Sequence, residues 1–380
     1  MELFNKQITE LYKDKYKLIS IVVYLFVCTL YCVKYLSKVS ALASVVGTVL
    51  FIAGIMLLLY KGDRFGRYTQ TTLLVVYTIL GGILVPILFP VGTFRLDRWD
   101  MIEVFWNALL DKQYPFAASG LTSDNTPAQS PFYFLICFPF YVTKWYVGIP
   151  LVGLWMYRWA IRIMSKSSNL SMLMLLASPF ILHEVITCNS IFFNSTLFIA
   201  WISYLWIGRD LNVKSMVVHG LVGGLLLCTR NCYIIPMMTM GLTMLRLQDK
   251  KIVWFWGLSV VISFLLAYLP FVFGWGLDSW YKWNPFKVQS EMIISVDMMA
   301  VILTITIVLG LCCKNFKQAT FVAGICLFLA NFILFIEKTW ESGIEYSLLE
   351  SGTDISYFVL CIPFLMLFVD TKKIGNCKEL

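Results

Sequence analysis

The sequence predicts an all-α polytopic membrane protein with about 12, alternatively about 13, transmembrane helices. Hydrophobic residues make up 59% of the 380 residues and charged residues only 14%, whereas soluble domains average about 45–50% and about 25%. The mean hydropathy is +0.78. This composition excludes a cytosolic enzyme, a nucleic-acid-binding protein and a disordered chain.

The apolar runs are the elements on which this prediction depends. A helix needs about twenty apolar residues to cross roughly 30 Å of hydrocarbon. Runs suited to one crossing occupy 18–37, 40–60, 69–93, 188–207, 214–229, 231–245, 252–274, 291–311, 318–336 and 355–370. Shorter or ambiguous runs occupy 131–143, 146–164 and 169–186. No repeat or low-complexity linker divides the chain, so we expect one integral domain over residues 1–380.

The basic residues predict the orientation of these runs. Lys and Arg gather in short links, which is typical of cytoplasmic loops, while 337–354 holds five acidic residues and one Lys and is expected outside. Three spans then place 94–130 outside, and residues 131–186 must cross an even number of times for both chain ends to be cytoplasmic. In the 13-helix alternative the C-terminus is outside. The net charge of +8 therefore reflects topology and does not indicate nucleic acid.

The polar outer segments of useful length are 94–130, 275–290 and 337–354. Within the first, apolar and polar residues separate at helical spacing. We therefore expect an amphipathic helix over 100–111, lying at the membrane surface. Its apolar face holds Phe105, Trp106, Ala108 and Leu109, and its polar face Asp100, Glu103 and Asn107.

The order of motifs around this helix resembles a known enzyme superfamily. Asp97 and Asp100 directly follow a span and precede Val104-Phe105-Trp106, Gln113-Tyr114-Pro115-Phe116 and Ser130-Pro131-Phe132. This order resembles the GT-C superfamily of multi-pass glycosyltransferases, which use polyprenyl-phosphate-linked sugars. A weaker likeness includes His183-Glu184-Val185, Cys228-Thr229-Arg230 and Asn284-Pro285-Phe286, so it covers about residues 95–290.

The resemblance implies an inverting, mannosyltransferase-like hexosyltransferase. It would move a sugar from a polyprenyl-phosphate donor to a lipid-linked, glycan or protein acceptor on the outer side, without a nucleotide sugar. The expected partners are the lipid bilayer, this donor and this acceptor, with no nucleic acid. A multi-pass location in the bacterial inner membrane is favoured over the endoplasmic reticulum.

A carboxylate has a physical reason to lie in the first outer loop. Inverting transfer requires the acceptor hydroxyl to lose its proton as it attacks the anomeric carbon, and a nearby carboxylate suffices as the base. Asp100 and Asp97 are the candidate catalytic residues, and the sequence leaves open which of them is the base. Both could instead pair with Arg95 and Arg98 in a solvated cap.

The remaining candidate residues would bind substrate. A leaving phosphate needs positive charge, which Arg delivers as a bidentate fork. Arg230 lies between two short apolar runs and is the first candidate, although an Arg at a span end is often only a membrane anchor. Glu184, at the outer end of a span, could be a second acid or orient the acceptor, while His183 beside it could bind substrate or only complete a hydrogen bond at the helix end. The candidates of this class are Arg230, Glu184, His183, Lys282, Lys287 and Arg98.

No metal or cofactor is called for by these residues. The chain has two His, and no Cys and His spacing resembles a zinc site; a divalent metal stays open. Two alternatives to the enzyme are a transporter or flippase of lipid-linked saccharides and a polysaccharide polymerase. A transporter is expected to show related halves with charges near the midplane, and a polymerase a later, arginine-lined outer loop. Neither pattern is evident.

Overall fold

The computed structural model describes residues 14–61, 67–90, 93, 97–120, 125–164, 170–207, 211–286, 296–350 and 352–370. These residues are helical with short connections and contain no strand, so the all-α prediction is confirmed for this part of the chain. The first half holds α2 (Lys15–Leu36), α3 (Ala41–Lys61), α4 (Arg67–Leu88), α5 (Asp97–Leu110), η2 (Pro115–Ala117), α6 (Pro131–Thr143), α7 (Gly148–Met164), α8 (Leu170–Ala177) and α9 (Pro179–Ile186).

The second half continues the bundle. It holds α10 (Ile191–Trp206), α11 (Val213–Leu227), η3 (Asn231–Tyr233), α12 (Ile234–Leu247), α13 (Lys250–Trp283), α15 (Val296–Cys312), α16 (Phe316–Ile344), η4 (Glu345–Leu349), η5 (Ile355–Cys361) and α17 (Ile362–Asp370). Each predicted apolar run thus contains one helix or two short ones. The run 169–186 is divided because Pro179, which cannot donate a backbone hydrogen bond, starts the new helix α9 after Ser178.

Several helices are apolar enough to lie in a membrane. Five described helices could cross it alone by length and composition: Lys15–Leu36, Ala41–Lys61, Tyr68–Leu88, Lys250–Trp283 and Phe316–Leu349. The α9 and α10 pair passes the same test as a broken span, bent by 110°. The other apolar helices are shorter, so a total of about 12 crossings stays a prediction.

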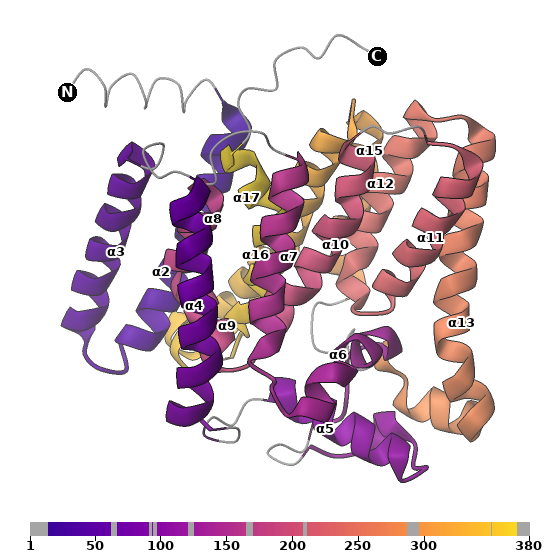
Figure 1. The fold of residues 1–380 in the computed structure, drawn as a ribbon, viewed down its shortest axis with the longest axis horizontal. Coiled ribbons are helices and arrows are strands. Elements are labelled where there is room, and N and C mark those ends of the chain that lie inside the picture. The colour runs from indigo at the N-terminus through magenta and orange to yellow at the C-terminus, as the bar shows by residue number, and fades with distance from the viewer. Residues whose placement is uncertain are drawn as a thin grey trace.

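The two ends of the bundle differ. In Figure 1 the start of α2 and the end of α17 lie at the top, while α5 and α6 lie at the bottom, which we name the α5 end. The predicted helix at 100–111 is found as α5, and its apolar face is buried. Phe105 stacks on Phe134 of α6 with ring centroids 3.8 Å apart. Its location at a membrane surface stays a prediction.

Glycines bring α11 and α13 close together. Gly220 and Gly224 are spaced four residues apart on one face of α11, the spacing that lets two helix backbones approach in membranes. A Cβ on Gly224 would lie 2.1 Å from Ser263 Oγ and 2.2 Å from the Val260 carbonyl oxygen of α13. The close approach therefore leaves no room for a side chain at this position.

Two expected loops are partly helical. We expect loops at 275–290 and 337–354 from their polarity, but α13 continues to Trp283 and α16 to Ile344. Each helix bends at a glycine with positive φ, +82° at Gly276 and +84° at Gly343, a conformation that other residues rarely adopt. The chain stays helical after each bend, but the polar end of the helix points in a different direction from the segment before the glycine.

Candidate functional site

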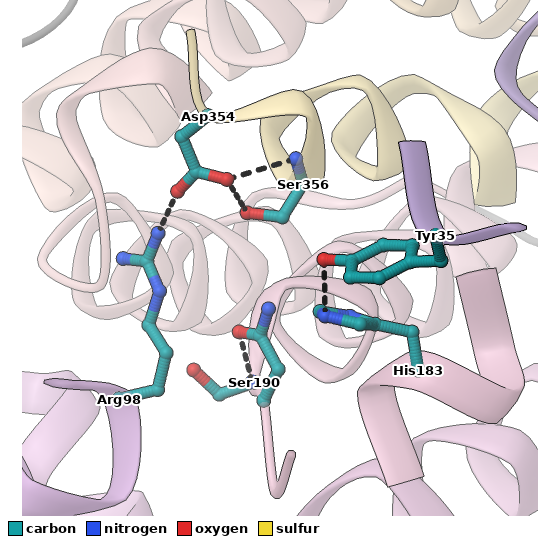
Figure 2. A network of polar contacts seen from close by, with 7 residues as sticks. Tyr35, Arg98, His183, Ser190, Asp354 and Ser356 are labelled. Atoms are coloured by element: carbon teal, nitrogen blue, oxygen red, sulfur yellow. Dashed lines mark hydrogen bonds and ion pairs between the residues drawn. The ribbon is translucent and has the colours of Figure 1, made fainter. Parts of the chain in front are cut away.

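Arg98 anchors a polar cluster at the α5 end of the bundle. It lies in the first turn of α5, and its Nη2 donates to Asp354 Oδ2 at 2.5 Å, although the two residues are 256 positions apart. Asp354 precedes η5, and its other oxygen accepts from the Ser356 backbone N–H at 2.9 Å and from Ser356 Oγ at 2.6 Å (Figure 2). The ion pair thus joins the predicted surface helix to the last apolar segment.

Asp354 packs among other residues of the cluster, but 46% of its side chain is exposed to solvent. Burial alone would raise the pKa of this carboxyl, but Arg98 and the two hydrogen bonds from Ser356 outweigh that effect and hold the pKa below the ordinary Asp value. The side chain of Arg98 is only 11% exposed. The cluster therefore meets solvent at Asp354 and becomes buried beyond it.

Arg230 approaches the same place from another helix break. It has an extended backbone, with φ −153°, between α11 and η3. Its guanidinium carbon lies 5.7 Å from the centre of the Tyr357 ring, and that of Arg98 lies 5.3 Å from the same ring. Arg230 is 3% exposed, and its Nε and Nη2 have no hydrogen-bond partner among the described residues. Two buried guanidinium groups therefore share one aromatic ring.

Backbone contacts fix this turn against the start of α6. The N–H groups of Ser130 and Phe132 donate to the carbonyl oxygens of Thr229 and Cys228 at 3.2 and 3.1 Å. The predicted re-entry at Ser130-Pro131-Phe132 and the predicted Arg230 turn thus lie side by side. Pro131 at the first position of α6 needs no hydrogen-bond acceptor there.

Glu184 lies at the corner between α9 and α10. Its Oε2 accepts the Phe192 backbone N–H at 3.0 Å at the start of α10, while its Oε1 is buried and has no hydrogen-bond partner among the described residues. The positive charges of Arg98 and Arg230 both act on this carboxyl.

His183 faces the last turn of α2. Its Nε2 forms a 2.8 Å hydrogen bond with Tyr35 Oη (Figure 2), and the Tyr31 and Tyr35 rings lie 5.3 and 4.9 Å from the imidazole. In the nearby turn between α9 and α10, Asn189 Oδ1 accepts the Ser190 N–H at 2.7 Å. Four of the residues predicted to bind substrate, Arg98, His183, Glu184 and Arg230, therefore come together at one end of the bundle.

The predicted catalytic carboxylates both belong to α5. Asp97 begins the helix, but its side chain is outside the described part of the structure. Asp100 is fully buried and acts electrostatically on Tyr146. On the same side of α5, Glu103 accepts hydrogen bonds from Lys144 at 2.7 Å and from Tyr146. Asp100 therefore lies within electrostatic range of Tyr146, in the connection between α6 and α7.

The two predicted lysines are not placed in this cluster. Lys282 is exposed near the end of α13, with its ammonium 5.4 Å from the centre of the Trp283 ring. Lys287 lies outside the described residues. In the part of the chain that the structure describes, no group of three or more His, Cys, Asp or Glu is arranged to hold a metal ion.

Sequence reasoning missed three members of the cluster. The sequence places Asp354 in the acidic outer segment and Tyr31 and Tyr357 in apolar runs, and marks none of them as a site residue. The available signal was the position of Asp354 directly before an apolar run and in an outer segment. Comparison of the chain with protein-family models, with curated proteins and with solved structures finds no match.

Proposed function

We propose that this chain is a membrane glycosyltransferase. It moves a sugar from a polyprenyl-phosphate donor to a lipid-linked, glycan or protein acceptor at the α5 end of the bundle. The observation that carries the proposal is the pair of buried arginines, Arg98 and Arg230, on the Tyr357 ring. Guanidinium groups are well suited to a phosphate oxyanion, and Arg230 has two unpaired N–H donor positions, Nε and Nη2.

The chemistry assigns each charged group one task. The acceptor oxygen attacks the anomeric carbon and gives its proton to the Asp100 carboxylate, with Asp97 as the alternative base. The bond between the anomeric carbon and the phosphate oxygen breaks, and its electron pair leaves with the polyprenyl phosphate. Arg98 and Arg230 stabilise the charge that develops on that phosphate. Attack opposite the leaving group inverts the anomeric configuration.

The arrangement of elements supports this division. Arg98 and Asp100 lie two residues apart on α5, so one short helix carries both a cation for the phosphate and a buried carboxylate. Tyr357 also lines a small apolar cavity, with Ile235, Leu327 and Leu360 among others, which has room for about one water molecule. We place the protein in a membrane as a multi-pass protein and favour the bacterial inner membrane over the endoplasmic reticulum.

The test is transfer from a panel of polyprenyl-phosphate sugars by the protein in liposomes. We expect Arg230→Ala to lower kcat/KM for the donor by about 10²–10³. The matched control is Arg246→Ala, because Arg246 Nη1 donates to carbonyl oxygens at and just after the end of α15, at 3.4–3.5 Å. The phosphate assignment is wrong if Arg98→Ala and Arg230→Ala, both folded, retain the wild-type kcat/KM.

A further inference from the structure

Two connections between helices carry positive charge at the end of the bundle opposite the α5 end. Residues 248–249 connect α12 to α13, and residues 313–315 connect α15 to α16; both connections lie at the top in Figure 1. From the first of them α13 runs to the α5 end, where Trp275 Nε1 donates to the Lys112 carbonyl oxygen at 3.4 Å. Four basic side chains lie in or beside these connections, and we name them the link lysines: Lys250, Lys251, Lys314 and Lys317.

Arg246 holds the two connections side by side. It lies in the last turn of α12. Its Nη1 donates to the carbonyl oxygens of Leu311, Cys312 and Cys313 at 3.4, 3.4 and 3.5 Å. Such carbonyl oxygens at a helix end have no later N–H of the same helix to bind. Because α13 starts four residues after Arg246 and α16 starts three residues after Cys313, this contact keeps the two helix starts at neighbouring positions.

No described residue neutralises the link lysines. Three of them are exposed, and Lys317 is partly exposed. None of their ammonium groups has a hydrogen bond or an ion pair with a described residue, although that of Lys317 lies 5.7 Å from the centre of the Trp206 ring. Asp249 is the one acid within 246–251 and 312–317, and its Oδ1 accepts the Lys251 backbone N–H at 3.0 Å as a helix cap. The link lysines therefore form a surface with excess positive charge.

The positions of these lysines add their charge to that of the backbone. Lys250 and Lys251 lie in the first turn of α13 and Lys317 in the first turn of α16, and neither turn holds an acid. The N-terminus of a helix carries about half a positive charge, so acids are favoured there and bases are disfavoured. The like charges repel one another, and a bound anion would turn this repulsion into attraction.

Exposed apolar side chains near the link lysines favour a lipid as the source of this anion. Leu245 of α12, Trp254 of α13 and Leu311 of α15 are 57%, 78% and 49% exposed, and each lies within five residues of a link lysine. Trp is typical of the interface between hydrocarbon and headgroups. A phospholipid carries its phosphate next to its acyl chains, so one molecule matches both kinds of surface. Basic surfaces between transmembrane helices on the cytoplasmic side are typical sites for anionic headgroups.

We infer that the link lysines bind the headgroup phosphate of an anionic phospholipid, whose acyl chains lie against the exposed apolar side chains of α12, α13 and α15. The lipid contacts both connections and so stabilises α12 and α13 against α15 and α16. This surface lies at the opposite end of the bundle from Arg98 and Arg230. The inference therefore does not depend on the proposed function.

The test measures lipid binding to the full chain in detergent micelles by native mass spectrometry. The probes are phosphatidylglycerol, the zwitterionic phosphatidylcholine, and glycerol 3-phosphate as a soluble phosphate ester. Two double variants, Lys250→Gln/Lys251→Gln and Lys314→Gln/Lys317→Gln, each remove two link lysines. The matched control is Lys15→Gln/Lys61→Gln, which removes two exposed lysines at the same end of the bundle, on α2 and α3. The Tm without added lipid shows that each variant is folded.

We expect phosphatidylglycerol to bind about tenfold or more tightly than phosphatidylcholine. Each link-lysine variant should weaken the binding of phosphatidylglycerol about 20-fold, because one lysine near an anionic lipid surface contributes about fivefold. The control variant should keep the wild-type affinity. The preference for phosphatidylglycerol should decrease as the ammonium acetate concentration rises from about 0.1 M to about 1 M, because the Debye length falls from about 10 Å to about 3 Å.

Three outcomes would overturn the lipid site. The first is equal binding of phosphatidylglycerol and phosphatidylcholine by the wild type. The second is an equal loss of affinity in the control variant, which would indicate diffuse attraction to the whole basic end of the bundle. The third is binding of glycerol 3-phosphate as tight as that of the lipid, which would assign the surface to a soluble phosphate ester. The two link-lysine variants are independent, so a folding defect in one leaves the other to decide.

Discussion

Removing the charge of Asp354 should destabilise the α5 end by a predictable amount. Asp354→Asn keeps an oxygen to accept the Ser356 N–H and so preserves the start of η5. It removes the ion pair with Arg98, which solvent screens because 46% of the Asp354 side chain is exposed. We therefore expect a loss of about 1 kcal/mol in the free energy of unfolding. Asp354→Ala also removes the cap and should lose about 1 kcal/mol more.

The pH dependence of this loss follows from the lowered pKa of Asp354. A carboxyl whose pKa is lower in the folded state stabilises the protein above its unfolded pKa of about 3.9. That stabilisation is lost as pH falls through the lower folded value. The difference between wild type and Asp354→Asn should therefore be constant from pH 8 to pH 5 and disappear only below about pH 4.

Reversible unfolding in mixed micelles, measured at pH 7 and pH 3, checks both statements. Asp354→Asn and Asp354→Ala serve as a pair, because only the second removes the cap. The reasoning would be refuted if Asp354→Asn were as stable as the wild type at pH 7. It would also fail if the deficit persisted undiminished at pH 3.

Three further predictions concern the base and the packing. Asp100→Asn should lower the rate of transfer about 10²–10⁴-fold; full activity of both Asp100→Asn and Asp97→Asn would remove the base assignment. Phe105→Ala, which removes the ring stacked on Phe134, should cost about 3 kcal/mol of unfolding free energy in micelles; a loss below half of this would show that α5 is held otherwise. Gly224→Ala should cost about 1–3 kcal/mol because its Cβ meets the α13 backbone. Gly257→Ala, where nothing lies within 4 Å, is its control and should be neutral or slightly stabilising.

Local features of the fold were predictable from the sequence. The apolar runs locate the helices because backbone groups in hydrocarbon must be satisfied within the segment, and the 3.6-residue spacing at 100–111 predicts α5. The polar ends of α13 and α16 were not predictable as helix. Polarity indicates exposure to water, and an exposed helix end is as polar as a loop.

The site was predictable only in part, for a similar reason. Arg230, Glu184 and Arg98 are scarce charges at the ends of apolar runs, which marks them individually. Their meeting with Asp354 depends on which helix ends lie side by side, and a contact across 256 positions has no local signal. Tyr31 could not be predicted as a site residue, because the sequence does not show whether the hydroxyl of a buried Tyr has a hydrogen-bond partner.

The 110° bend between α9 and α10 has a consequence for engineering this chain. A straight helix through 187–190 would be the simpler solution for the backbone, and consensus redesign for higher stability would favour it. Such a redesign would retain Glu184 but remove the corner at which its carboxylate accepts the Phe192 N–H. An engineered variant must therefore keep the backbone bend between α9 and α10 as well as the side chains at that bend.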